Sequence, residues 1–113
     1  MSRAAVDRAG DLMHDPNSLV GVAFRYAAWL RETEQWEAMT LFSFVIHPAI
    51  GRLAGMGKTR ISDLTPAMVR RTIRVAAQDG IDAELAFGAW VDFLEFLDVE
   101  GVPHHPRLLD LAS

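Results

Sequence analysis

The sequence predicts an all-α fold, a compact bundle of five or six helices that forms a single domain. Apolar residues recur at the three- and four-residue spacing of amphipathic helices, and prolines, glycines and capping residues separate the segments that carry this pattern. A chain of 113 residues has room for one domain. A domain of this size buries roughly 65% of the surface that its unfolded chain exposes, which is enough for a self-sufficient core.

The N-terminal segment is expected to be the weakest part of the domain. Residues 2–14 suit a helix, but Gly10 and the small apolar side chains around it predict that this helix frays. We therefore divide the chain into a frayed segment, residues 1–17, and a single helical domain over residues 18–113.

An amphipathic helix is predicted to follow Ser18 and to run to about Arg31. Ser18 closes a turn, and its hydroxyl makes it a good N-cap. The apolar positions that recur along this helix are Leu19, Val22, Ala23, Tyr26, Trp29 and Leu30.

The next segment, from about Glu34, is apolar on nearly every side, which is typical of a central helix or a buried strand; its length and first residues favour a helix. Pro48 is expected to end or kink it, because proline lacks an amide hydrogen and its ring clashes with the preceding turn. A short helical turn through Leu53 is expected next. A flexible connection should follow, marked by Gly51, Gly55 and Gly57.

The clearest boundaries belong to a helix over residues 66–78. Thr65 is its N-cap, Pro66 occupies the first helical position, and Asp79-Gly80 closes it with a glycine cap.

The last long helix is predicted to begin after Asp82 and to end near Glu100, before Gly101 and Pro103. Carboxylates form a narrow stripe along it, and apolar residues fill the remaining arc, so it should be the most buried helix. One terminal turn is expected within residues 107–112. The predicted core of the whole domain includes Trp29, Phe42, Phe44, Phe87, Trp90, Phe93 and Leu94.

Composition excludes several classes of protein. The chain has no cysteine, so a disulfide framework, a thiolate metal site and a thiol nucleophile are all impossible. A net charge of −4 argues against a surface wholly dedicated to nucleic-acid phosphates. The first eight residues lack the apolar block of a secretory signal, and no stretch reaches about 18 uncharged apolar residues. We expect a cytoplasmic protein with no membrane contact.

Half of the residues are apolar, including three Trp and six Phe. A small domain has a high ratio of surface to volume and normally needs many polar positions. This surplus of apolar residues predicts a surface that binds a partner.

The tripeptide Gly57-Lys58-Thr59 is similar to the end of a phosphate-binding loop. The spacing fails, because the first glycine of that motif should stand at position 52, where the chain has Arg52. The segment after Thr59 also reaches a helix only through a further cap. A glycine-rich connector is the favoured interpretation.

No constellation of catalytic or metal-binding residues stands out. The histidines are too dispersed to supply three or four convergent zinc ligands: His104 and His105 are expected in a solvated loop, and His47 at the end of a helix. Ser18 is interpreted as a cap and Ser43 as a small core residue, neither with the context of a nucleophile. We expect no enzymatic activity, no metal and no small-molecule cofactor.

Charge segregation is the feature with the greatest functional weight. The basic residues between positions 52 and 74 face only Asp63 as an acidic neighbour in sequence, whereas residues 82–100 contain six carboxylates and no basic residue. Within the helix from 66, three arginines should project to one side. The candidate binding residues for a partner or a phosphate are Arg52, Lys58, Arg60, Arg70, Arg71 and Arg74.

Three interpretations of this cluster remain open. The arginines could form a solvated face that pairs with the acidic helix of the same molecule, for about 0–1 kcal/mol per exposed pair. They could form a protein-binding or homodimer surface, in which basic and acidic faces of two subunits meet around an apolar centre. They could also contact phosphates locally, as in a DNA-associated accessory protein.

A recognisable order of features runs from Ile61 to Pro106: Leu64-Thr65-Pro66-Ala67-Met68-Val69, Asp79-Gly80-Ile81, the aromatic run from Trp90 to Leu97, and Gly101. Over residues 61–106 this order resembles the SAM-like core-binding domain of tyrosine recombinases. The resemblance implies a helical, non-catalytic domain that clamps DNA, with Arg70, Arg71 and Arg74 as backbone contacts. The helix after the glycine turn is usually basic in that family and is acidic here.

The leading hypothesis is therefore a small, non-catalytic, intracellular protein-interaction module of the regulator or inhibitor type, which binds a protein partner or itself as a homodimer. The alternative is the DNA-associated protein that the resemblance implies.

Overall fold

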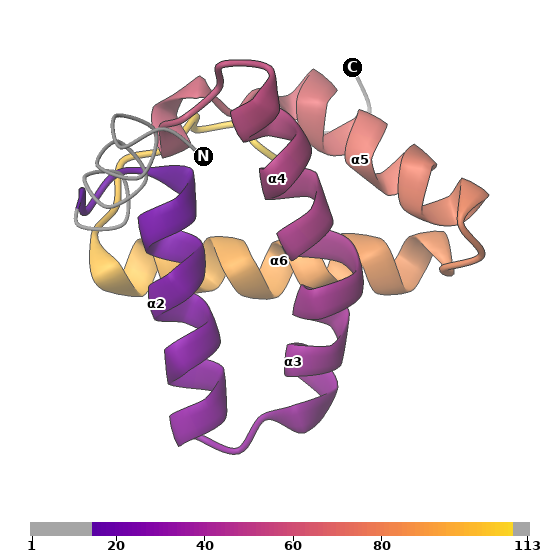
Figure 1. Ribbon diagram of the computed structural model, residues 1–113, viewed down its shortest axis with the longest axis horizontal. Coiled ribbons are helices and arrows are strands. Elements are labelled where there is room, and N and C mark those ends of the chain that lie inside the picture. Colours follow the sequence, from indigo (N-terminus) through magenta and orange to yellow (C-terminus); the bar gives the residue numbers. More distant parts are fainter. Residues whose placement is uncertain (1–14, 110–113) are drawn as a thin grey trace, which may run out of the picture.

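The computed structural model describes residues 15–109, and this part of the chain is helical, with one isolated bridge between Ser18 and Arg60 and no β-strand. The predicted all-α class is confirmed (Figure 1). The weak helix expected over residues 2–14 lies outside the described residues. The elements are α2 (Leu19–Glu32), α3 (Trp36–Leu41), a π-helical segment (Phe42–Ile46), α4 (His47–Gly55), a 3₁₀ turn (Ile61–Asp63), α5 (Pro66–Gln78) and α6 (Ala83–Glu100).

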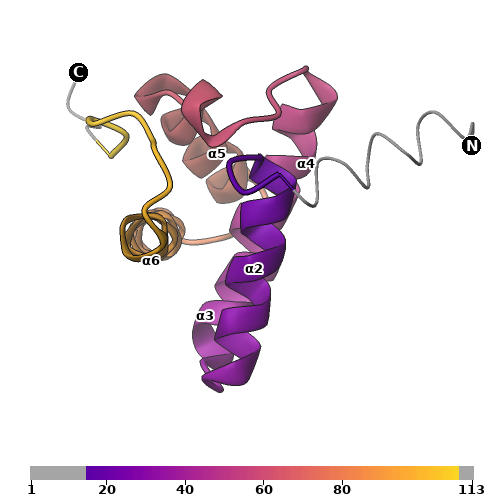
Figure 2. The ribbon, with the colours of Figure 1, turned by 90° about the vertical axis from the view of Figure 1, so that its left-hand side faces the viewer.

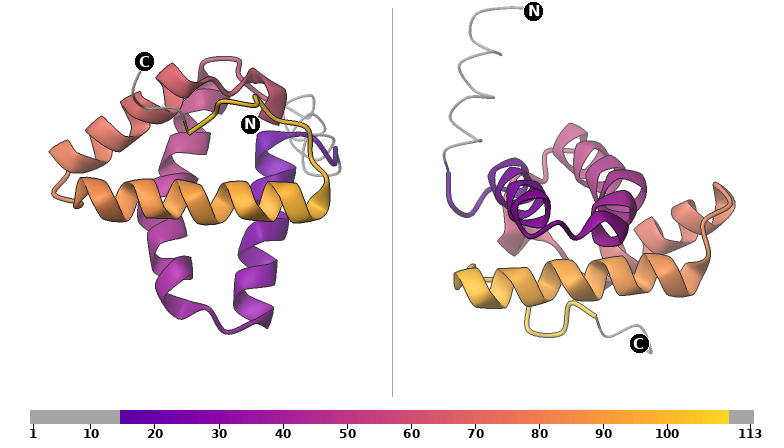
Figure 3. Two further views of the ribbon diagram at one scale, coloured as in Figure 1. Left: turned by 180° about the vertical axis from the view of Figure 1, so that it is seen from behind. Right: turned by 90° about the horizontal axis from the view of Figure 1, so that it is seen from below.

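Two antiparallel rods and a crossing helix define the architecture. Helix α2 forms one rod, and α3, the π-helical segment and α4 together form the second, which we call the central rod (Figure 1). Helix α6 crosses both rods on one face, as Figure 3 shows from behind. Helix α5 lies against the central rod and leads through a tight turn into α6, which Figure 2 shows end-on.

Pro48 does not end the central helix, contrary to one of the two outcomes expected for it. The N–H of His47 bonds to the carbonyl of Phe42, five residues earlier, so the turn before Pro48 is one residue wider than an α-helical turn. Such a π-bulge relieves the clash that a proline ring would make with the preceding turn. The helix then continues to Gly55, beyond the short turn expected through Leu53.

The continuous central rod corrects three further predictions. The described residues contain four helical rods instead of five or six separate helices. Gly51 and Gly55 lie within α4, and only Gly57, at φ +84°, belongs to the connection that follows. His47 lies inside the rod and is exposed there, not at a helix end, because the helix continues through Pro48.

Capping interactions fix the helix boundaries close to where the sequence placed them. The Ser18 hydroxyl accepts the N–H of Gly21 at 2.9 Å, which caps α2. Asp82 accepts the N–H groups of Glu84 and Leu85 at 2.8 and 3.3 Å, which caps α6. Predicted boundaries that follow from capping chemistry are thus confirmed, including the range 66–78 for α5.

The core forms where α6 crosses the two rods. The Tyr26 ring of α2 lies 5.2 Å from the ring of Phe93, 5.1 Å from Phe96 and 5.6 Å from Phe42, measured between centroids. Trp90 is also buried. Its indole N–H has no hydrogen-bond acceptor among the described residues. Burial raises the pKa of the Tyr26 hydroxyl, and the charges of Asp92 and Glu95 raise it further.

The predicted core is right in part. Phe42, Trp90 and Phe93 are buried as expected, and Leu94 is half-buried. Three predicted core residues are instead exposed: Trp29, Phe44 and Phe87, with Phe44 at 65%. Ser43 is exposed as well and donates its hydroxyl to the Met39 carbonyl, so it is not a core residue. The central rod and α6 are apolar on several sides, and the pattern does not reveal which of those sides meets a neighbour.

By length and composition alone, the segment Trp36–Gly55 is apolar enough to cross a membrane, and 33% of its most apolar 18-residue stretch is buried inside the fold. The sequence-based expectation concerned stretches of about 18 uncharged apolar residues, and this segment carries two charged ones. Glu37 and Arg52 are the two Asp, Glu, Lys or Arg residues within it, one near each end.

Replacing Asp82 with Ala should destabilise the fold by about 1 kcal/mol, because two N–H groups at the start of α6 lose their acceptor. The melting temperature, measured by circular dichroism, should fall by about 4 °C. Asp92→Ala, which removes a carboxylate from the middle of the same helix, should change stability by less than about 0.5 kcal/mol. Equal melting temperatures for the two variants would contradict this role of Asp82.

Candidate interaction surface

The structure places the six predicted basic residues in three locations: a groove, the part of α5 outside that groove, and a loop. Arg52 on α4 and Arg71 on α5 line the same groove between these two helices. Arg74 is exposed on α5 but does not line the groove, and Arg70 is half-buried on the same helix. Lys58 and Arg60 lie in the loop that joins α4 to α5. Of the cluster predicted from the sequence, Arg52 and Arg71 therefore line a groove together, and the other four residues do not.

Arg60 has a structural role. Its guanidinium contacts the Asp15 carboxylate at 3.3 Å, and its backbone N–H bonds to the Asp63 carboxylate at 3.1 Å. The backbone beside it also joins the start of α2, since the N–H of Ile61 bonds to the carbonyl of Asn17 at 2.9 Å. Arg60 thus holds the loop against α2.

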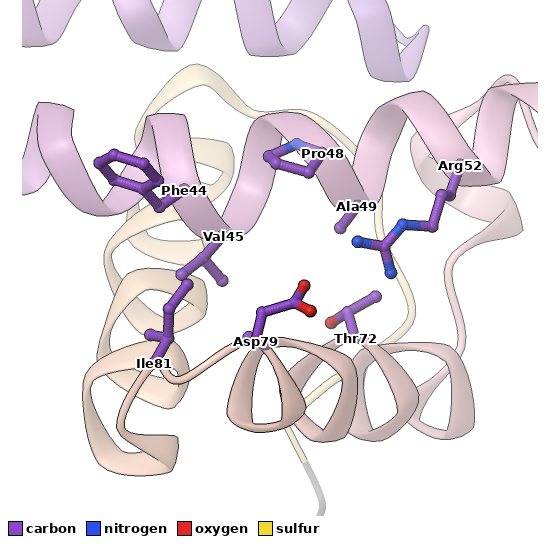
Figure 4. Close-up of a pocket in the computed structure, with 9 residues that line it drawn as sticks. Phe44, Val45, Pro48, Ala49, Arg52, Thr72, Asp79 and Ile81 are labelled. Carbon is purple, nitrogen blue, oxygen red and sulfur yellow. The ribbon is translucent and has the colours of Figure 1, made fainter.

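The groove between the central rod and α5 combines apolar and charged side chains. It consists of two adjoining hollows that share Ala49, Arg52 and Thr72. Figure 4 shows the larger hollow, where the Arg52 guanidinium and the Asp79 carboxylate both point inward. These two groups do not form an ion pair within 4 Å among the described residues. With Arg71 in the adjoining hollow, the groove has an excess of one positive charge.

Exposed apolar side chains flank the groove. Phe44, from the π-helical segment, stands at one end, and Met56, which follows α4 and is 62% exposed, stands at the other. Both side chains occupy a position where a partner's apolar surface could bury them. Sequence analysis missed this role for Phe44, since an aromatic residue in an apolar helix looks the same whether it faces the core or a partner.

A second, acidic surface lies at the other end of the central rod, between α3 and α6. Glu34, Glu37 and Asp92 line a hollow together with Trp36, whose side chain is 58% exposed. A neighbouring hollow is lined by Glu37, Thr40, Leu41 and the exposed Leu85. The residues that line these two hollows include three carboxylates and no basic side chain.

Pairing between the arginines of α5 and the carboxylates of α6 within one molecule does not account for the exposed arginines. Neither Arg71 nor Arg74 forms an ion pair with any described residue. Ion pairs within residues 15–109 include Arg60 with Asp15 and His104 with Asp98.

His104 attaches the segment after α6 to the end of that helix. Its Nε2 lies 2.7 Å from the Asp98 carboxylate and its Nδ1 lies 3.0 Å from the His105 carbonyl, so both ring nitrogens face oxygen acceptors. Burial lowers the pKa of His104, but the bonds to Asp98 and to the His105 carbonyl raise it more, so the net pKa is above its ordinary value. Within residues 15–109, no group of three His, Asp or Glu residues could hold a metal ion.

Comparison with protein-family models, with curated proteins and with solved structures finds no match to this chain. The resemblance to the core-binding domain of tyrosine recombinases stays a prediction.

The His104 pKa predicts the sign of a pH dependence of stability. A group whose pKa is higher in the folded state stabilises the fold fully below its unfolded pKa of about 6.5, and this contribution disappears as the pH rises through the folded pKa. The melting temperature should therefore fall less between about pH 5.5 and about pH 8 for Asp98→Ala than for the unmodified chain. Glu95→Ala, which removes a carboxylate that does not contact His104, should retain the original pH dependence.

Proposed function

We propose that this protein is a small, non-catalytic protein-interaction module of the regulator or inhibitor type that acts as a homodimer. The observation that carries the proposal is that exposed apolar side chains lie beside positive charge at one part of the surface and beside negative charge at another. Phe44 and Met56 flank the groove that holds Arg52 and Arg71, whereas Trp36 and Leu85 lie beside carboxylates.

Large exposed side chains of this kind are typical of binding surfaces. Isolated exposed apolar residues are common in monomers, but contiguous ones bordered by polar groups indicate an interface. Aromatic side chains, Met and Arg are enriched at such interfaces, and Trp and Arg commonly supply much of the binding energy. Trp36, Phe44, Met56 and Arg52 have this composition.

Charge complementarity favours a second copy of the chain as the partner. A groove with excess positive charge attracts an acidic surface, and the same chain presents one around Glu37. Each copy thus carries both halves of a complementary contact. A cytoplasmic location, expected from the sequence, is part of this proposal.

Light scattering should give a mass of about 25 kDa, twice the 12.5 kDa of one chain, at micromolar concentrations. Dilution should shift the mass toward that of one chain, because the proposed interface involves a single face of a small domain. A mass of one chain across the whole concentration range would refute the homodimer.

A DNA-associated accessory role is the second candidate, favoured by Arg71 and Arg74, which are both exposed and unpaired among the described residues. If it holds, gel-shift titrations should give a log–log dependence of affinity on salt with a slope of roughly −3 to −5, for three to six phosphate contacts. Replacing Arg70, Arg71 and Arg74 together should abolish the complex. The absence of any complex at low salt would remove this candidate.

A further inference from the structure

One stripe of exposed and half-buried residues on the central rod changes from acidic at one end to basic at the other. Its residues stand three or four positions apart and, with the widened turn before Pro48 taking up one residue, they fall within an arc of about 120° around the rod. They line the hollows on either side of the point where α6 passes behind the rod. The stripe consists of Glu37, Leu41, Phe44, Pro48, Arg52 and Met56.

Phe44 stands almost at the midpoint between the two charged residues of this stripe. Glu37 precedes it by seven residues and Arg52 follows it by eight. At 1.5 Å per residue, these separations correspond to about 10 Å and about 12 Å along the rod. A residue whose aromatic side chain is 65% exposed therefore has an acidic residue on one side along the rod and a basic residue at nearly the same axial distance on the other.

This arrangement is self-complementary under a two-fold rotation. If two rods lie antiparallel with their Phe44 side chains at the axis, Glu37 of each copy faces Arg52 of the other. A two-fold interface requires this property, because the same patch must complement itself. The surroundings agree, since Glu34 and Asp92 add negative charge near Glu37 and Arg71 adds positive charge near Arg52. Asp79 offsets part of the positive end.

We propose that this stripe is the dimer interface, and that two copies pack antiparallel about a two-fold axis at Phe44 with reciprocal contacts between Glu37 and Arg52. The inference rests on the homodimer proposed above and specifies its geometry. Pro48 and the half-buried Leu41 would fill the space between the central aromatic pair and the charged ends.

Charge reversal tests the geometry, with dimer dissociation measured by sedimentation equilibrium. Glu37→Arg places two Arg–Arg contacts in the dimer, and Arg52→Glu places two Glu–Glu contacts. Each single variant should raise the dissociation constant at least about tenfold. Two combinations should restore dimerisation: the double variant Glu37→Arg/Arg52→Glu, and an equimolar mixture of the two single variants, in which both contacts regain opposite charges.

Two matched controls separate this interface from general effects of the substitutions. Phe44→Ser should weaken the dimer at least about tenfold, whereas Phe24→Ser, which changes a residue of similar exposure (61%) on α2, should leave it within about twofold. Arg74→Glu, a reversal in the basic cluster but outside the groove, should also leave it within about twofold. Circular dichroism of each variant should match the unmodified chain.

The outcomes distinguish the inference from the proposal on which it rests. A dimer that is insensitive to Glu37→Arg, Arg52→Glu and Phe44→Ser would overturn the antiparallel geometry and leave the homodimer intact. Weakening by both single reversals without rescue in either combination would also overturn it, since the charges would then not face each other. A chain that is monomeric before any substitution would overturn both.

Discussion

The crossing of α6 over the two rods is the constraint on which the rest of the fold depends. Tyr26 lies at its centre, with its ring against Phe42 of the central rod and Phe93 and Phe96 of α6. Aromatic pairs in such edge-on and tilted arrangements contribute about 0.5–1.5 kcal/mol each beyond the burial of their area. Three elements meet at one residue, and this contact leaves the outer side of the central rod exposed to solvent.

Helix boundaries could be predicted from the sequence because short-range chemistry determines them. Thr65 and Asp82 accept N–H groups within three residues, Pro66 occupies a first-turn position that needs no N–H donor, and Gly101 adopts the left-handed φ of +69° that ends α6. The π-helical segment escaped prediction for the opposite reason. A proline can either end a helix or be accommodated by a wider turn. The residues Phe42–Ile46 do not indicate which of these happens before Pro48.

The sequence did not reveal which apolar side chains point into the core and which point to solvent. Phe42 and Phe44 are two residues apart in the same apolar run, yet the first is buried and the second is largely exposed. Which one meets α2 and α6 depends on contacts distant in sequence. The arginine cluster was predicted from charge alone, but its division into Arg52 and Arg71 in a groove and Arg60 in a structural contact required the fold.

The widened turn before Pro48 also sets the rotational phase between the two halves of the central rod. Each residue of an α-helix advances the chain by about 100° around its axis, so the extra residue turns α3 relative to α4 by about that angle. Over the fifteen residues from Glu37 to Arg52, an uninterrupted α-helix would leave the two side chains about 60° apart, and the widened turn leaves them about 40° apart in the opposite sense. A single-residue deletion within Phe42–Ile46 would restore regular hydrogen bonding there and would keep α3 and α4 in their present rotational register, because the widened turn already takes up one residue.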